Sequence, residues 1–234
     1  SVPRSIADPL TSHEVNATGF LNMCIALKEN KQVKRMVYAA SSSTYGDHQA
    51  LPKVEDQIGK PLSPYAVTKY LNELYADVFG RTYNTNMIGL RYFNVFGPKQ
   101  SPNGAYAAVI PLFMQALKSN KPATINGDGE QTRDFTYVDN AVQANIKAFF
   151  APEEASNQVF NVACGERISV NTLWERLAAA ASSSLQPIYG PPRQGDVRDS
   201  LADISKAKRL LGYEPQVSVR QGLDLTWEYF VKKH

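Results

Sequence analysis

A tyrosine and a lysine stand four residues apart in the segment Tyr65-Ala66-Val67-Thr68-Lys69. On a helix, residues at positions i and i+4 share one face. An ammonium beside a phenol favours the phenolate and lowers the tyrosine pKa toward neutrality. Such a tyrosine can take a proton from an alcohol or return one to a ketone. The spacing alone is weak evidence, because Tyr229 and Lys233 repeat it near the C-terminus, where we interpret Tyr229 as a packing residue.

A run of serines, Ser41-Ser42-Ser43, follows the apolar segment 35–40. In parallel sheets, ligand chemistry gathers at the carboxyl ends of the strands. Serine hydroxyls at such an end can share a proton with a tyrosine or bind the reacting oxygen. Taken alone, the run could also be a capping turn, which is the less favoured interpretation.

The segments around these residues predict alternating strands and helices. We expect buried strands at 35–40 and 87–92, separated by a helix over 65–83 that begins just after Ser63-Pro64. Strand, helix, strand is the signature of a parallel sheet. A helix is also expected over 14–28, in a helical stretch that Asp8-Pro9 opens. Beyond residue 98 the pattern predicts helices at 107–117, 139–150, 170–182, 204–211 and 219–232, and strands at 123–126, 158–162 and 185–189.

Composition excludes several classes of protein. A chain of 234 residues, 43% of them hydrophobic, can bury one large or two small cores. The net charge of +3 does not indicate a nucleic-acid partner. The longest apolar run, Ala105–Met114, is too short to span a bilayer, so no membrane partner is expected.

Other catalytic classes lack their central residues. The chain has 3 histidines and contains no H-E-x-x-H, G-x-S-x-G or P-loop motif. Its 2 cysteines, Cys24 and Cys164, lie far apart and form no C-x-x-C. We therefore expect no metal site and no disulfide, and a reducing, cytoplasmic setting.

As an ordered set, the motifs resemble the extended short-chain dehydrogenase/reductases and, within them, the nucleotide-sugar 4-epimerases. The matching segments are Asp8-Pro9 with Asn16-x-x-Gly19, Ser41-Ser42-Ser43-Thr44-Tyr45-Gly46, Ser63-Pro64-Tyr65-Ala66-Val67-Thr68-Lys69, Leu90-Arg91-Tyr92-Phe93-Asn94-Val95-Phe96-Gly97-Pro98, Gly127-Asp128-Gly129-Glu130-Gln131-Thr132-Arg133-Asp134-Phe135 and Arg193-x-Gly195-Asp196. Each segment is unspecific, but together they span nearly the whole chain in order.

The resemblance implies an α/β fold: the C-terminal part of a doubly wound, Rossmann-type parallel sheet with a smaller α/β substrate-binding domain. Residues 1–95 and 134–166 would form the cofactor domain, which carries the Ser/Tyr/Lys residues. Residues 96–133 and 167–234 would bind the nucleotide sugar. NAD would be the cofactor and a UDP-sugar the substrate. Relatives pair through two helices per subunit, here about 14–28 and 65–83, so a homodimer through a four-helix bundle is implied.

The resemblance also assigns roles to individual residues. Tyr65 would be the acid/base, Lys69 would hold the nicotinamide ribose and tune Tyr65, and Ser41 would share the hydrogen bond to the sugar 4-hydroxyl. The main chain of Phe93 would touch the nicotinamide end. The residues implied to bind the substrate are Ser42, Ser43, Asn94, Ala108, Val109, Thr124, Ile125, Asn126, Arg133, Arg193, Asp196 and Ser200. Among them, Arg133 and Arg193 would neutralise the diphosphate, a task suited to guanidinium groups.

The implied reaction is oxidation of C4 to a ketone, rotation of the keto sugar and reduction from the other face. The usual setting of the family is the supply of precursors for surface polysaccharides. Dehydratases of the family carry an Asp-Glu pair where this chain has Ser42 and Ser43, which disfavours dehydration. Epimerases restricted to plain hexoses have a bulky tyrosine at the position of Ser200. The serine leaves room for an N-acetyl group, so UDP-GlcNAc and UDP-GalNAc are the expected substrates.

One family feature is missing from the sequence. No G-x-G-x-x-G or G-x-x-G-x-x-G fingerprint follows a strand. We therefore expect the chain to be the C-terminal portion of an epimerase. Two alternatives stay open: another nucleotide-sugar reductase or decarboxylase of the family, and a catalytically inactive remnant that binds UDP-sugars.

Overall fold

The computed structural model describes residues 1–103, 107–192 and 198–232. At its centre lies a parallel sheet of three strands in the order β1-β2-β7. The strands are β1 (Met36–Ser41), β2 (Met87–Tyr92) and β7 (Gln158–Val162). All of β2 except Tyr92 is buried, because it is the middle strand and helices cover both faces.

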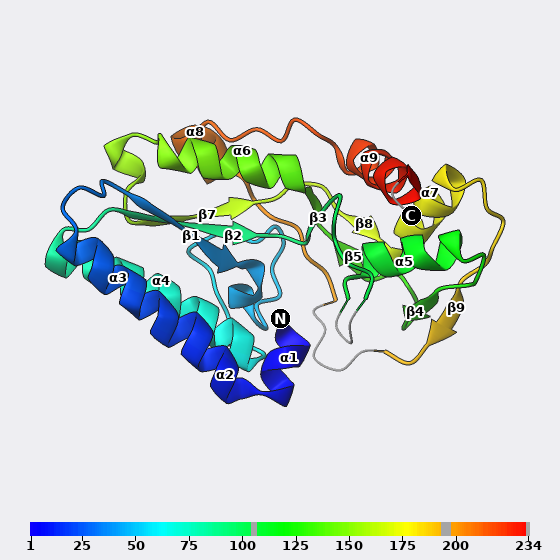
Figure 1. Ribbon diagram of the computed structural model, residues 1–234, viewed down its shortest axis with the longest axis horizontal. Helices are drawn as coiled ribbons and strands as arrows, with labels where there is room; N and C mark the ends of the chain where they lie inside the picture. Colours follow the sequence, from blue (N-terminus) through cyan, green and yellow to red (C-terminus); the bar gives the residue numbers. More distant parts are fainter. Residues whose placement is uncertain (104–106, 193–197, 233–234) are drawn as a thin grey trace.

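Helices form a layer on each face of this sheet (Figure 1). The layers consist of α3 (Gly19–Glu29) and α4 (Pro64–Tyr83) on one face, and α6 (Val138–Phe149) and α8 (Ser205–Leu211) on the other. Cys24 and Phe79 pack with Met87 in the first layer. Ala144 and Leu211 pack with Phe160 in the second. The predicted α/β fold with a Rossmann-type parallel sheet is confirmed.

The N-terminal helical segment is longer and less regular than expected. It consists of α1 (Val2–Ala7), α2 (Pro9–His13), a π-helical turn η1 (Glu14–Thr18) and α3. The Asp8 side chain accepts a hydrogen bond from the Thr11 N–H at 3.1 Å and Pro9 follows it, so α2 has a regular N-terminus. The predicted opening of the helical stretch at Asp8-Pro9 is confirmed, and a further helix, α1, precedes it.

A second group of elements packs beside the sheet (Figure 1). Its helices are α5 (Val109–Lys118), α7 (Val170–Ala180) and α9 (Val219–Lys232). Its strands are β4 (Thr124–Asn126), which pairs in parallel with β9 (Ile188–Gly190), and β5 (Thr132–Arg133), which pairs antiparallel with β8 (Ile168–Ser169). Phe113, Trp174 and Leu223 lie in one apolar core that joins the three helices.

Short pairings join the two groups. β3 (Val95–Phe96) pairs in parallel with β6 (Thr136–Tyr137). Phe96 and Tyr137 both belong to the apolar core that joins α5, α7 and α9. The helix α8 packs on β7, although residues 167–234 were predicted to belong to the substrate domain. The division into two domains stays a prediction.

Candidate active site

The serine run lies at the carboxyl end of β1, as predicted. Ser41 ends the strand, and Ser42 opens a short 3-10 turn, η2 (Ser42–Tyr45). The Ser41 Oγ accepts a hydrogen bond from the Ser43 N–H at 3.2 Å, and the two hydroxyl oxygens lie 2.8 Å apart. The run is therefore both a capping turn and a pair of linked hydroxyls.

Tyr65 and Lys69 lie in the first turns of α4, which packs on both β1 and η2. The Lys69 Nζ is 5.9 Å from the centroid of the Tyr65 ring and donates a hydrogen bond to the Ala39 carbonyl of β1 at 3.0 Å. Burial lowers the pKa of the Lys69 ammonium. The predicted tyrosine–lysine pair thus lies on the helix that packs against the serine-bearing turn.

An open groove of about 370 Å³ lies beside Lys69. Its floor includes the edge strand β1 at Tyr38 and Ala39, and its wall includes Asn16 and Gly19 from the π-helical turn and the start of α3. Turns of π-helix often occur at functional sites.

A second cavity, of about 280 Å³, brings together many of the predicted substrate-binding residues. The predicted residues in its lining are Asn94, Ala108, Val109, Thr124, Ile125, Asn126 and Arg133. They come from the segment after β2, from the start of α5, and from β4 and β5. Lys69 lines the other cavity, so the predicted residues fall into two groups.

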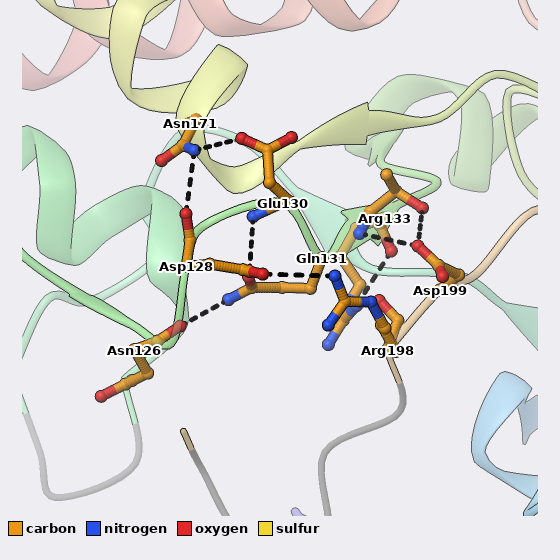
Figure 2. A network of polar contacts seen from close by, with 9 residues as sticks. Asn126, Asp128, Glu130, Gln131, Arg133, Asn171, Arg198 and Asp199 are labelled. Carbon is orange, nitrogen blue, oxygen red and sulfur yellow. Dashed lines mark hydrogen bonds and ion pairs between the residues drawn. The ribbon is translucent and has the colours of Figure 1, made fainter. Parts of the chain in front are cut away.

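Asn126, Gln131 and Arg133 of this lining also belong to a network of polar contacts (Figure 2). The Arg133 Nη1 donates to the Arg198 carbonyl at 2.8 Å and to the Thr132 carbonyl at 2.9 Å. Arg198 also forms an exposed ion pair with Asp128 at 3.2 Å. The Gln131 Nε2 donates to the Asn126 carbonyl at 2.7 Å. Arg198 is thereby joined to β5 and to the turn between β4 and β5.

Ser200 lies beside a buried carboxylate that sequence reasoning did not single out. The Asp134 N–H donates to the Ser200 Oγ at 3.3 Å, and the Asp134 carbonyl accepts a hydrogen bond from Asn94 Nδ2 at 2.9 Å. The Asp134 carboxylate accepts hydrogen bonds from the N–H groups of Cys164, Gly165 and Ala202 at 3.0 to 3.2 Å. Burial raises the pKa of this carboxyl to about 7. Its position between Arg133 and Phe135 in the matched motif was the available signal.

Phe93 follows directly after β2 and lies in the core. The Phe93 side chain is fully buried, its N–H donates to the Val162 carbonyl at 3.0 Å, and its carbonyl accepts from the Thr136 hydroxyl at 2.7 Å. Its main-chain groups are therefore already bonded within the protein. Arg193 and Asp196 lie outside the described residues.

The described residues, 1–103, 107–192 and 198–232, contain no membrane-spanning helix and no metal-binding cluster. In this part of the chain, no helix has the length and apolar character needed to cross a membrane. Over the same residues, no three His, Cys, Asp or Glu side chains gather in a group suited to a metal ion.

A parallel sheet between helical layers, with polar residues at the strand ends, is the architecture of Rossmann-type enzymes. Residues 1–163 match the NAD dependent epimerase/dehydratase family, and the chain belongs to that family. The predicted cofactor, NAD, is the cofactor in the family's name.

Several similar proteins of this family have a named activity. The UDP-glucose 4-epimerase of Mycolicibacterium smegmatis is 35% identical over 100% of this chain and 74% of its own length. The solved UDP-N-acetylglucosamine 4-epimerase from Methanobrevibacter ruminantium M1, in complex with UDP-N-acetylmuramic acid, matches with a TM-score of 0.95 and 37% identity over 100% of this chain and 74% of that one. A Thermotoga maritima UDP-glucose 4-epimerase with UDP-glucose gives a TM-score of 0.94 and 38% identity over 99% and 74%. The chain is thus similar to UDP-sugar 4-epimerases.

Proposed function

We propose that the chain is the catalytic part of a UDP-N-acetylhexosamine 4-epimerase, an isomerase that interconverts UDP-GlcNAc and UDP-GalNAc through a 4-keto sugar. The observation that carries this proposal is that the chain has two sites. One is the Tyr65–Lys69 pair on a helix that packs against the serine turn. The other is the cavity lined by Asn94 and Arg133. The first suits proton transfer at a sugar hydroxyl. The second suits a nucleotide diphosphate.

In the proposed reaction, Tyr65 takes the proton of the sugar 4-hydroxyl and returns it after the sugar has turned over. Ser41 shares the hydrogen bond to that oxygen. Ser43 holds Ser41 through its linked hydroxyl, and Ser42 lines the sugar site. Lys69 lies near the Tyr65 ring, with its Nζ 5.9 Å from the ring centroid. When bound, NAD supplies the acceptor and later the donor of the C4 hydride.

The residues beside Lys69 fit the nicotinamide end of NAD. The open groove next to the Lys69 ammonium offers space at the edge of β1, where a ribose hydroxyl could accept a hydrogen bond from Nζ. Lys69 would hold the ribose, while the sequence has no glycine fingerprint for the pyrophosphate. The residues beside Lys69 therefore fit the nicotinamide end of NAD, and this fit does not extend to the pyrophosphate.

The 280 Å³ cavity is proposed to hold the UDP portion of the substrate. Thr124, Ile125 and Asn126 of β4 would border the uracil, with Ala108 and Val109 on the nucleotide's other side. Asn94, Arg133 and, from outside the described residues, Arg193 with Asp196 would contact the diphosphate. A guanidinium group suits this role because it forms paired hydrogen bonds to phosphate oxygens.

Ser200 is proposed to form the wall next to the sugar C2 substituent. Its hydroxyl accepts a hydrogen bond from the Asp134 N–H, and its side chain is much smaller than the tyrosine expected where only plain hexoses bind. This supports the N-acetylated substrates over the plain hexoses.

A homodimer through α3 and α4 is part of the proposal. The two helices pack on each other, and α4 exposes Val67, Leu74 and Val78, whose side chains share one face of the helix. Light scattering should give the mass of two chains for the unsubstituted protein and of one chain for Leu74→Arg.

A proton NMR assay tests the activity. The chain is mixed with UDP-GlcNAc and excess NAD, and the anomeric signal of UDP-GalNAc is followed. We expect the signal for the unsubstituted chain and for the control Tyr70→Phe on the same helix, and its loss for Tyr65→Phe. Consumption of NAD would instead indicate a reductase or decarboxylase. Binding of UDP-GlcNAc without any product would indicate an inactive binding remnant.

A further inference from the structure

The first turn of α4 has one donor that no residue of its own helix satisfies. Ser63 caps this helix: its Oγ accepts from the Ala66 N–H at 3.2 Å, and its carbonyl accepts from the Val67 N–H at 3.1 Å. Pro64 has no N–H. The Tyr65 N–H remains, and the first N–H groups of a helix have no partner within it.

Ser5 supplies that partner from another helix. The Tyr65 N–H donates to the Ser5 Oγ at 2.9 Å, across a sequence separation of 60 residues. Ser5 is fully buried, and its hydroxyl donates to the Val2 carbonyl at 2.8 Å, so the lone pairs of Oγ are oriented by α1 itself. Figure 1 places α1 beside the start of α4, and the two helices are in contact.

The other main-chain group of Tyr65 is also held. Its carbonyl accepts a hydrogen bond from Thr68 Oγ1 at 2.8 Å, and Thr68 Oγ1 accepts one from Asn16 Nδ2 at 3.1 Å. The backbone of Tyr65 is thus fixed by the segments that precede the sheet.

The same short helix reaches the substrate cavity. Pro3, two residues before Ser5 on α1, lines the 280 Å³ cavity together with Asn94 and Arg133. The helix α1 therefore connects the lining of the cavity, through Pro3, to the amide of Tyr65, through Ser5.

We infer that Ser5 is a positioning residue for Tyr65, which fixes the phenol relative to a substrate held in that cavity. The inference rests on the proposed function of Tyr65 as the acid/base. Loss of the Ser5 hydroxyl leaves the Tyr65 N–H without its acceptor, so the first turn of α4 loosens while the cavity keeps its lining. Proton transfer depends steeply on such placement, and substrate binding does not.

The test compares Ser5→Ala with Ser12→Ala in the full chain. Ser12 is a matched control, because its hydroxyl also donates to a carbonyl of its own helical segment, that of Asp8 at 2.9 Å. Amide hydrogen exchange at Tyr65, measured by NMR, gives a readout that does not depend on activity. We expect exchange at Tyr65 to be faster by about tenfold or more in Ser5→Ala and unchanged in Ser12→Ala.

Kinetics on UDP-GlcNAc with NAD provide the second readout. For Ser5→Ala we expect kcat to fall by about tenfold to a hundredfold with KM within about twofold. Ser5→Cys, whose thiol is slightly larger and a weak acceptor, should give an intermediate kcat. Ser5→Thr keeps a hydroxyl and should have a kcat near that of the unsubstituted chain.

Unchanged exchange at Tyr65 in Ser5→Ala would overturn the inference, and so would faster exchange along the whole of α4, which would indicate a general loss of stability. A raised KM with an unchanged kcat would also overturn it. If the unsubstituted chain turns over no UDP-sugar, the proposed function fails, and the exchange at Tyr65 still decides whether Ser5 holds its amide.

Discussion

Arg91 of β2 and Glu73 of α4 form a buried ion pair through two hydrogen bonds, Nε to Oε1 at 2.9 Å and Nη2 to Oε2 at 2.7 Å. Their side chains are only 4% and 6% exposed. Arg91 also donates to the Glu55 carbonyl at 2.9 Å. The pair fixes the middle strand of the sheet to the helix that carries Tyr65 and Lys69.

Removing one partner of this pair should be strongly destabilising. Arg91→Met leaves the Glu73 carboxylate buried without its partner, which typically costs about 3–5 kcal/mol of unfolding free energy. The double variant Arg91→Met/Glu73→Leu should lose less than the sum of the two single changes. Urea denaturation measures all three.

The control for this prediction lies on the same helix. Asp77 and Arg81 form an ion pair whose side chains are 55% and 69% exposed. Asp77→Asn should change the unfolding free energy by no more than about 1 kcal/mol. Equal losses for the buried and the exposed pair would contradict the argument from burial.

The Asp134 carboxyl should make the stability of the protein depend on pH. Its pKa is about 7 in the folded chain and 3.8 ordinarily, so the folded state binds more protons between these values. The contribution of Asp134 to stability is therefore complete below about pH 4 and is lost as pH rises to about 7, by at most about 1.4 kcal/mol per pH unit.

Asp134→Asn should remove this slope, as measured by urea denaturation between about pH 5 and pH 8. Asp203→Asn is the control, because hydrogen bonds from Ser205 hold the pKa of Asp203 below its ordinary value, outside that window. A slope identical to that of the unsubstituted chain would mean that Asp134 does not titrate there.

The sequence was informative where a signal is local. The motif from Ser63 to Lys69 predicted both the helix α4 and the facing tyrosine and lysine, since capping, proline at the first turn and i, i+4 spacing act over a few residues. The parallel sheet followed from strand, helix, strand order.

Contacts between distant segments could not be predicted in this way. Three examples depend on how separate segments pack. They are the hydrogen bond from Tyr65 to Ser5, those that Cys164 and Ala202 donate to Asp134, and the one from Arg133 to Arg198. The strands β3, β5, β6 and β8 have 2 residues each, too few to show an alternation.

Two glycines in the turn after β4 allow a paired test of how closely this turn is packed. Gly127 and Gly129 have φ of 76° and 77°, where a side chain is strained. A Cβ at Gly127 would meet nothing nearer than the Pro192 Cα at 3.9 Å, but at Gly129 it would lie 2.0 Å from Asn171 Oδ1. Asn171 in turn donates to the Asp128 carbonyl at 3.0 Å and to Glu130 (Figure 2).

Gly127→Ala should therefore cost about 1–2 kcal/mol of unfolding free energy from backbone strain alone. Gly129→Ala should cost distinctly more, because Asn171 must also move and its bonds to the turn are lost. Thermal and urea unfolding of the two variants provide the comparison. Equal costs would mean that Asn171 swings away freely.

Exchange of the small Ser200 side chain for a tyrosine should alter substrate choice. Ser200→Tyr fills the space proposed for the N-acetyl group and removes the acceptor of the Asp134 N–H. Turnover of UDP-GlcNAc and UDP-GalNAc should be lost, while turnover of UDP-glucose is retained, as followed by the same NMR assay with each substrate. A steric clash discriminates strongly against the larger substrate only.

Ser200→Ala separates the steric effect from the hydrogen bond. It removes the hydroxyl without adding volume, so both classes of substrate should lose activity to the same small extent. If Ser200→Tyr abolished or preserved turnover of both classes alike, Ser200 would not be the wall beside the C2 substituent. Retained turnover of UDP-glucose alone would place it there, because the added ring then excludes only the acetylated sugars.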